Sequence, residues 1–326
     1  MSKCQGCGIK LQTEKSNELG YTTNKTKSIC ERCFRLKNYG EYKTVILNNE
    51  DYQKIINAIP DTSLIVYVVD ILSLNLKNIL RKENSILAIT KYDIFPKSTN
   101  ETKILSSLKK EYPEFLDIIC ISSLKNYNID KLYNTITKHH QNNPIFLVGN
   151  TNSGKSTLLN KLIQNYDPTN NVQVTVSMYP STTLDKVEIN LNDLTIIDTP
   201  GLIEEGNYVN ILSQKDLKKI TPKKEIKPKS CQITGTGSIA IDNYVRIDYE
   251  TKEKNSFVIY TARGVESKFI SYKKNTYQDL CSHKYSLGSN QDIVLPGLGF
   301  IKFTKPIKVT LYTNEKIKPY TRNNLI

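Results

Sequence analysis

Five short runs in the first two thirds of the chain are apolar at consecutive positions rather than at alternate ones. They end near Val69, Ile89, Ile121, Val148 and Ile197. Such runs are typical of strands buried on both faces, inside a parallel sheet that helices cover. Apolar stripes at helical spacing accompany them, at 52–59, 129–136 and 158–163. We therefore predict an α/β domain with five buried parallel strands.

Two departures from this pattern indicate other structure. Between residues 186 and 191 apolar and polar positions alternate strictly, as expected of a half-exposed antiparallel strand. After residue 215 a link with several lysines and prolines leads to short alternating runs separated by Gly and Asn turns, which predict a β-rich domain. We divide the chain into a small module of residues 1–42, the α/β domain of residues 43–215 and the β-rich domain of residues 216–326.

A glycine-containing motif follows the fourth apolar run. It consists of Gly149, Asn150, Thr151, Asn152, Ser153, Gly154, Lys155 and Ser156, with Thr157 directly after it. In a phosphate loop of this pattern, backbone N–H groups cradle phosphates, the lysine reaches the β and γ oxygens, and the serine hydroxyl ligates Mg²⁺. The buried strand before it and the helical stripe after it are the context that this motif requires. The sequence therefore predicts a nucleoside triphosphate site here.

A second motif follows the fifth apolar run and reads Asp198, Thr199, Pro200 and Gly201. Asp198 is placed to hold Mg²⁺ through water, and the Gly201 amide is placed to meet the γ-phosphate. Between the two motifs, Thr183 would complete the Mg²⁺ shell, with Thr182 as the alternative. Short hydroxyl-rich loops are common, so a polar loop without a ligand is the competing interpretation.

Base recognition is predicted from the loops after the second and third apolar runs. The second run leads into Thr90, Lys91, Tyr92 and Asp93. Asp93 would accept hydrogen bonds from guanine N1 and N2, and the stem of Lys91 would cover the ring, which favours GTP over ATP. Thr90 stands where asparagine is usual in GTPases. The third run leads into a loop of Ser122, Ser123 and Leu124. A backbone N–H of this loop would meet guanine O6; taken alone, the loop would be interpreted only as a helix cap.

Four of the seven cysteines have metal-binding spacing. Cys4 and Cys7 are two residues apart, as are Cys30 and Cys33, and 22 residues separate the two pairs. Two such thiolate pairs complete a tetrahedral structural zinc site without an open position. A disulfide is the alternative, which a cytosolic location would disfavour. Basic residues beside the second pair are candidate RNA contacts: Arg32, Arg35 and Lys37.

The order of these motifs along the chain is shifted. The base-reading motif at 90–93 precedes the phosphate loop at 149–156, whereas in an ordinary GTPase it comes last. Together with the four cysteines and the segment 295–300, this order resembles the YqeH family of circularly permuted GTPases. The resemblance implies a P-loop GTPase sheet with a permuted motif order, flanked by a zinc module and a β-rich C-terminal domain. It also implies a role in assembly of the small ribosomal subunit, with that subunit or its precursor and ribosomal RNA as partners.

Composition and charge are compatible with this interpretation. The 326 residues are 38% hydrophobic, which is enough for a sizeable core, and the net charge is +13. The charge suggests an anionic partner such as RNA, although a lysine-rich composition also scatters lysines over a surface without function. Two clusters are candidate RNA contacts: Lys215, Lys218, Lys219, Lys223, Lys224, Lys227 and Lys229, and Lys302, Lys305, Lys308, Lys316, Lys318 and Arg322. Without a signal region or a membrane-spanning run, we expect a cytoplasmic protein with no membrane partner.

Hydrolysis should be slow. Leu202 stands where many signalling GTPases carry a glutamine that orients the attacking water. Lys155 and Mg²⁺ would stabilise the phosphoryl charge. Asn152 matches the asparagine that coordinates K⁺ in related GTPases, with a loop-shaping amide as the alternative.

Two functional classes remain open at this point. One is a GTP-binding and hydrolysing switch. The other is a zinc-containing RNA- or peptide-binding adaptor that nucleotide only stabilises. An ATP-driven enzyme is disfavoured by Asp93, and the oligomeric state is left open.

Overall fold

The computed structural model describes residues 2–24, 26–39, 49–76, 79, 83–169, 174, 185–272 and 280–326. The chain forms two compact units. The first comprises residues 1–71, 76–92 and 105–204, and the second comprises residues 72–75, 93–104 and 205–326. Neither unit is continuous in sequence, because the two short segments 72–75 and 93–104 belong with the C-terminal part of the chain.

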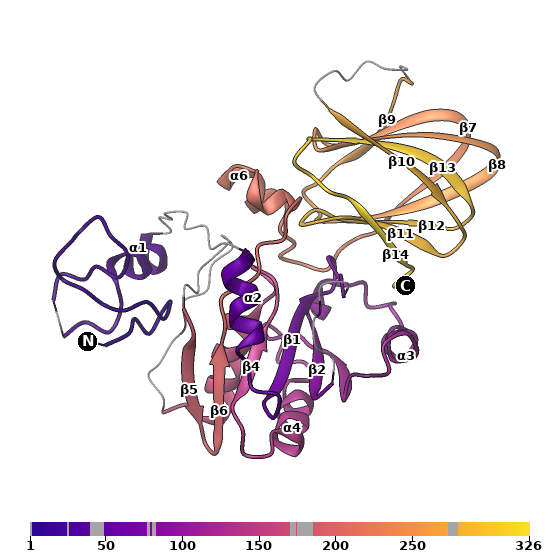
Figure 1. The fold of residues 1–326 in the computed structure, drawn as a ribbon. Coiled ribbons are helices and arrows are strands. Elements are labelled where there is room, and N and C mark those ends of the chain that lie inside the picture. Colours follow the sequence, from indigo (N-terminus) through magenta and orange to yellow (C-terminus); the bar gives the residue numbers. More distant parts are fainter. Residues whose placement is uncertain are drawn as a thin grey trace. The chain divides into compact units, whose positions relative to one another are not determined.

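The first unit contains a six-stranded mixed sheet with the order β3-β2-β1-β4-β6-β5 (Figure 1). Its strands are β1 (Leu64–Asp70), β2 (Ser85–Thr90), β3 (Asp117–Cys120), β4 (Ile145–Val148), β5 (Val187–Leu191) and β6 (Leu194–Asp198). All neighbours pair in parallel except β5, which runs antiparallel to β6. Along β5 buried and exposed side chains alternate. The five parallel strands and the half-exposed antiparallel strand predicted from the sequence are therefore confirmed.

Helices cover this sheet with their apolar stripes. The helical elements of this part of the chain are α2 (Asn49–Asn57), η1 (Tyr92–Ile94), α3 (Glu101–Glu111), α4 (Ile129–His139) and α5 (Lys155–Tyr166). Two of them, η1 and α3, extend into the second unit. Ile129 and Leu132 of α4 join Leu158 and Leu162 of α5 in one buried core with the strands. Each such aliphatic side chain stabilises the fold by about 1.5–3 kcal/mol when fully buried. Within the described ranges, every helix is too short or too polar to span a bilayer.

The permuted motif order leaves the spatial order of the strands suited to one site. Strand β2 comes before β4 in the chain, yet only β1 separates the two in the sheet. Parallel strands have their carboxyl ends at the same edge of a sheet, and ligands bind there in open α/β folds. The loops that follow β2, β4 and β6 therefore emerge together, although the chain reaches them in an unusual order.

The N-terminal part of the first unit has little regular structure. Helix α1 (Glu31–Tyr39) is accompanied by isolated bridges rather than by strands. Its buried core consists of Leu11 and the four cysteines of the predicted zinc site, with Ile9 and Ile29 packed against them. So small an apolar core stabilises a segment poorly, and a structural metal is one of the usual remedies.

The second unit is built on an eight-stranded antiparallel sheet that is strongly curved (Figure 1). Its strands are β7 (Lys229–Ile241), β8 (Val245–Thr261), β9 (Ser267–Ile270), β10 (Cys281–Leu287), β11 (Gln291–Leu295), β12 (Gly299–Phe303), β13 (Ile307–Thr313) and β14 (Tyr320–Asn323). Two helical elements precede the sheet, η2 (Tyr208–Asn210) and α6 (Gln214–Ile220). Strand β8 pairs with β7, with β13 through its first half and with β12 through its second half. This sheet confirms the predicted β-rich C-terminal domain.

A buried charged cluster lies within this second sheet. Arg246 Nε donates a hydrogen bond to Asp248 Oδ1 at 2.7 Å, and Ser238 Oγ donates to the same oxygen at 2.6 Å. All three residues are buried. Breaking such a pair leaves an uncompensated buried charge, which is far more costly than the net contribution of the intact pair.

Candidate functional site

The phosphate loop joins the end of β4 to the start of α5. Gly154 precedes the helix in the left-handed region, with φ of 100°, which glycine adopts without strain. Lys155 opens the helix and is buried, and its Nζ donates to the carbonyl oxygens of Gly149 and Asn150 at 2.9 and 3.0 Å. Burial lowers the pKa of Lys155 to about 8, and the carboxylate of Asp198 opposes this shift. A buried ammonium of this kind is suited to neutralise a phosphate that replaces its carbonyl partners.

The loop after β6 packs directly on the phosphate loop. The backbone N–H of Thr151 donates to Leu202 O at 2.8 Å, and the N–H of Leu202 donates to Gly149 O at 3.2 Å. A side chain at Gly201 would place its Cβ 2.8 Å from Thr151 N and 3.0 Å from Lys155 Nζ. Gly201 is therefore required by close approach, and its amide lies beside the ammonium that would bind phosphate.

Two of the predicted Mg²⁺ ligands are already in contact. Ser156 Oγ donates to Asp198 Oδ2 at 3.0 Å, from the first turn of α5 to the end of β6. A hydroxyl oxygen and a carboxylate oxygen are hard ligands of the kind that Mg²⁺ prefers, and here the two lie close together. Thr157 follows on α5 with an exposed side chain. Thr182 and Thr183 lie outside the described residues.

The base-reading motif is tied to the phosphate loop by two contacts. Thr90 Oγ1 lies 2.5 Å from Ser153 O, and Lys91 Nζ lies 2.9 Å from Asn152 O. These pairs are 63 and 61 residues apart in the sequence. Asp93 follows within η1 and is partly exposed. The structure thus brings Thr90 and Lys91 onto the loop that would bind phosphate.

The loop after β3 lies against the same motif. The N–H of Tyr92 donates to Ile121 O at 3.1 Å, and the rings of Tyr92 and Tyr127 stack with centroids 5.8 Å apart. Ser122 is buried and its hydroxyl accepts the N–H of Lys125 at 3.0 Å, while Leu124 is 73% exposed. Ser123 between them is partly exposed. The Ser122 side chain therefore shapes its own turn, which leaves backbone groups of this loop as the candidates for contact with guanine.

The sequence reasoning missed Asp70. Its Oδ2 lies 2.5 Å from Lys91 Nζ, so that Lys91 is held between a carboxylate and the Asn152 carbonyl. Lys91 adopts φ of 60° and Asn152 adopts φ of 61°, in the left-handed region. The available signal was the position of Asp70 at the carboxyl end of β1, the strand between β2 and β4.

The four cysteines form one buried cluster. Their ligand atoms all lie within 4.8 Å of one another, and none of the four forms a disulfide. Tetrahedral zinc with bonds of about 2.3 Å places sulfurs about 3.8 Å apart, and Cys7 Sγ lies 3.9 Å from Cys30 Sγ. Hydrogen bonds among the four thiols lower the pKa of Cys4 and Cys30 and raise the pKa of Cys7 and Cys33, so the four groups titrate together rather than independently. The donor set therefore fits Zn²⁺.

The cysteine cluster contacts the segment that precedes β5. The N–H of Asp185 donates to Cys7 O at 3.1 Å, and Lys3 Nζ lies 2.8 Å from Asp185 Oδ2. Gly8 has φ of 81°, and a Cβ there would lie 2.5 Å from Asp185 O. Glycine at position 8 is therefore required both by conformation and by the close approach of two backbones.

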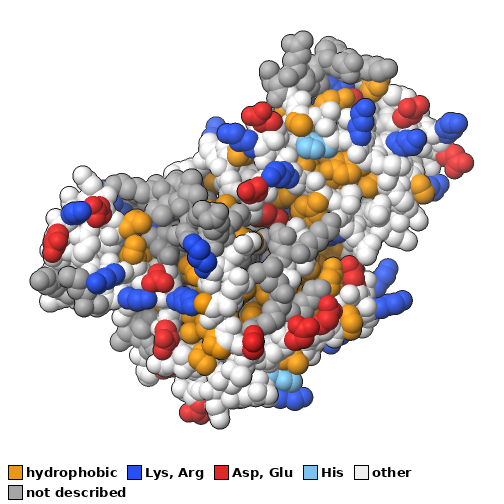
Figure 2. Space-filling model, viewed as in Figure 1, with side chains coloured by type: hydrophobic (Ala, Val, Ile, Leu, Met, Phe, Trp, Pro, Cys, Tyr) orange, Lys and Arg blue, Asp and Glu red, His pale blue; other side chains and the backbone are white. Residues whose placement is uncertain are grey.

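The basic clusters predicted as RNA contacts are only partly available on the surface. Four members bind groups of their own unit: Lys219 binds Asp242, Lys229 binds Val265 O, Lys318 binds Glu205 and Arg322 binds the buried Asp292. Lys302 and Lys305 contact the carbonyls of Ile326 and Lys254. Exposed lysines remain in both clusters: Lys215, Lys218, Lys223, Lys224, Lys227, Lys308 and Lys316. Figure 2 shows basic side chains spread over the visible face rather than gathered in one patch.

Comparison with known proteins assigns the family. Residues 144–234 match the family described as 50S ribosome-binding GTPase. The protein named YqeH of Bacillus subtilis is 31% identical to this chain over 99% of each length. NO-associated protein 1 of Arabidopsis thaliana is 24% identical, covering 72% of this chain and 49% of its own. The crystal structure of YjeQ from Thermotoga maritima matches 43% of this chain and 48% of its own, with 19% identity and a TM-score of 0.29. The identity of 31% over almost the full length of both chains makes this protein a member of the YqeH family with a GTPase domain.

Proposed function

We propose that this protein is a GTP-binding and hydrolysing switch that assists assembly of the small ribosomal subunit. The observation that supports this most directly is the contact between the base-reading motif and the phosphate loop, through Thr90 with Ser153 and Lys91 with Asn152. In this proposal residues 1–42 bind zinc, residues 43–215 bind and hydrolyse GTP, and residues 216–326 bind RNA or peptide.

The GTPase domain implies GTP or GDP and Mg²⁺ as ligands, and the described residues fit them. Guanine would be read by Asp93, with the stem of Lys91 covering the ring and the loop of residues 122–124 closing the other edge. The phosphates would lie on the N–H groups of residues 149–157, with Lys155 Nζ on the β and γ oxygens. Mg²⁺, when bound, supplies positive charge to the phosphates from a shell that includes Ser156, Asp198 and Thr183.

Hydrolysis in this proposal rests on positive charge rather than on a side chain that orients water. The side chain of Leu202 has no group that hydrogen-bonds water, and its backbone N–H and C=O are both bonded to the phosphate loop. Lys155 would stabilise charge that develops on the phosphoryl group, and K⁺ near Asn152 would add to it, as a positive group does in other GTPases. The left-handed backbone of Asn152 supports the alternative that its amide only shapes the loop.

Two cheap measurements test the nucleotide chemistry. Competition between GTP and ATP should favour GTP, and a preference for ATP would contradict the role of Asp93. Turnover should be slow in Na⁺ and faster in K⁺, and Asn152→Ala should remove that difference. Turnover that is insensitive to K⁺ and survives Asn152→Ala would leave Asn152 as a loop-shaping residue.

The partner is tested by co-sedimentation with purified ribosomal subunits at near-physiological salt. A non-hydrolysable GTP analogue, GDP and no nucleotide are compared for the small and the large subunit, because the description of the matched family names the 50S particle. The proposal expects binding to the small subunit that is strongest with the GTP analogue. Salt must be controlled because a protein of charge +13 binds any RNA when salt is low.

A Lys155→Ala variant separates a switch from a nucleotide-stabilised adaptor. In a switch the variant stays folded and loses the nucleotide dependence of subunit binding. Binding that ignores nucleotide in the wild type would support the zinc-containing adaptor. Selective binding to the large subunit would move the proposed role to that particle.

A further inference from the structure

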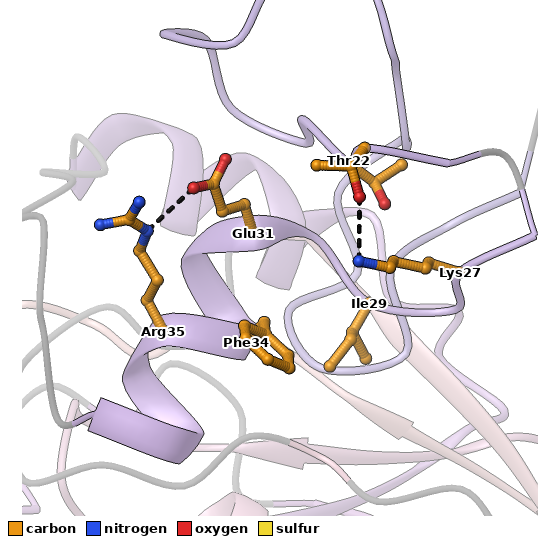
Figure 3. A pocket seen from close by; sticks show the side chains of 7 residues that line it. Thr22, Lys27, Ile29, Glu31, Phe34 and Arg35 are labelled. Carbon is orange, nitrogen blue, oxygen red and sulfur yellow. Dashed lines mark hydrogen bonds and ion pairs between the residues drawn. The ribbon is translucent and has the colours of Figure 1, made fainter.

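A cavity lies on the N-terminal zinc module between the loop that precedes α1 and the first turns of that helix (Figure 3). Its volume is about 360 Å³, which is within the range of small-ligand pockets, roughly 300–1,000 Å³. Its lining residues are Thr22, Thr23, Lys27, Ile29, Glu31, Phe34 and Arg35. None of these residues belongs to the candidate GTP site or to the four zinc ligands.

An exposed aromatic ring forms part of this cavity. Phe34 is 42% exposed, although it follows Cys33, which is buried in the cysteine cluster. Ile29 lies beside the ring (Figure 3) and packs against the same cluster. The cavity is therefore next to the cysteine cluster, and it presents an aromatic surface to solvent.

Two cations flank this ring in the view of Figure 3, each held by a neighbouring side chain. Lys27 Nζ donates to Thr23 Oγ1 at 2.9 Å and lies over one face of the Phe34 ring, 5.8 Å from its centroid, in a cation–π contact. Arg35 Nε lies 2.8 Å from Glu31 Oε1. These contacts orient the two cations while leaving both side chains exposed.

The charge of the whole module agrees with an anionic ligand. Residues 2–39 contain eight Lys or Arg and three Glu, a net charge of +5. Four thiolates around Zn²⁺ would reduce this to +3, so the module stays positive when metal is bound. An aromatic surface between two cations matches the alternation of bases and phosphates along single-stranded nucleic acid.

We propose that this cavity binds one unpaired nucleobase of RNA. The base stacks on the face of Phe34 that Lys27 does not cover, and Lys27 and Arg35 contact the neighbouring phosphates. Glu31 favours this ligand over an acidic peptide, because its carboxylate accepts from the amino group of a base but repels another carboxylate. The inference rests on the proposed function in one respect, since it takes the anionic partner to be RNA.

The test measures binding of a fluorescent single-stranded RNA of about ten nucleotides to the zinc-loaded full-length protein by anisotropy, without nucleotide. Phe34→Ala should weaken binding roughly 5- to 150-fold, the range for loss of one stacked base, and Phe34→Tyr should restore it. Leu19→Ala is the matched control, because Leu19 is a 41% exposed apolar residue of the same module that does not line the cavity. Zinc content and circular dichroism verify that each variant is folded.

A second arm tests the cations through salt dependence. Lys27→Ala should reduce the slope of log affinity against log salt by about 0.7, the contribution of one phosphate contact on a single strand. Lys10→Ala removes the same charge from an exposed residue of the module that does not line the cavity, and should change the slope less.

Equal losses for Phe34→Ala and Leu19→Ala, or equal affinity for the same sequence as a duplex, would overturn the proposal. If an acidic peptide displaces the RNA, and this displacement depends on Phe34, the ligand of the cavity is a protein partner rather than RNA. These outcomes are separate from the fate of the switch proposal, which depends on nucleotide-controlled sedimentation with a ribosomal subunit. If Phe34→Ala does not weaken RNA binding while the wild type still co-sediments with a ribosomal subunit under nucleotide control, only this inference is overturned.

Discussion

Removal of the Asp70 carboxylate should weaken guanine nucleotide binding although Asp70 is not part of any nucleotide motif. Asp70 Oδ2 holds Lys91 Nζ at 2.5 Å, and the same ammonium contacts Asn152 O at 2.9 Å. The two contacts fix the Lys91 stem beside the position where a guanine ring would lie. In Asp70→Ala the Lys91 ammonium keeps only its contact with the Asn152 carbonyl. Nucleotide binding must then order the Lys91 side chain, which is already ordered in the wild type.

The magnitude follows from the exposure of the pair. The side chains of Lys91 and Asp70 are 36% and 20% exposed, between the surface and the buried cases. Exposed ion pairs contribute about 0–1 kcal/mol and hydrogen bonds to charged groups about 1.5–3 kcal/mol. We therefore expect a loss of about 1–2 kcal/mol, which is about 5- to 30-fold in affinity. The affinities for GTP and for GDP should fall equally, because the proposed role of Lys91 is to cover the guanine ring, which both nucleotides share.

Stopped-flow measurement with a fluorescent GDP analogue provides the test. The weaker affinity should appear as a faster dissociation of the analogue. Asp117→Ala is the matched control, since Asp117 starts β3 of the same sheet and pairs with Lys109 at 2.7 Å, with side chains 21% and 53% exposed. The reasoning is refuted if Asp70→Ala binds GDP as tightly as the wild type while Lys91→Ala does not. A loss of the same size in Asp117→Ala would indicate a general effect on the fold.

Three further predictions concern stability. Gly8→Ala should destabilise the zinc module by more than the roughly 1–2 kcal/mol that a left-handed alanine costs, and the variant should lose zinc to a chelator faster than the wild type. Gly235→Ala is the control: Gly235 has φ of 64° and open space around it, so urea unfolding should show only the conformational cost. Removal of zinc by a chelator should increase hydrogen exchange in residues 2–39 and leave the second unit unchanged. Asp248→Ala should destabilise the second unit by about 3–5 kcal/mol in urea unfolding, because Arg246 would remain buried without its carboxylate; a loss below 1 kcal/mol would contradict this.

The chemistry of the candidate site could be predicted from the sequence because each motif is local. A phosphate loop needs neighbouring backbone N–H groups and one lysine, and residues 149–156 contain both. The apolar runs that end near Val69, Ile89 and Val148 likewise identified buried parallel strands, since strands covered on both faces are apolar at every position. The permuted order was visible without any structure.

Contacts between distant residues could be decided only by the tertiary structure. The partner of Lys91 is Asp70, 21 residues earlier, and the partner of Cys7 O is Asp185 near the start of β5. Neither pair has a spacing that a sequence pattern encodes, because strand order in the sheet determines which loop ends meet. The same holds for lysines such as Lys219 and Lys229, whose surface role depends on partners within their own fold. Local chemistry is determined by neighbouring residues, whereas the position of a side chain relative to distant ones depends on the path of the whole chain.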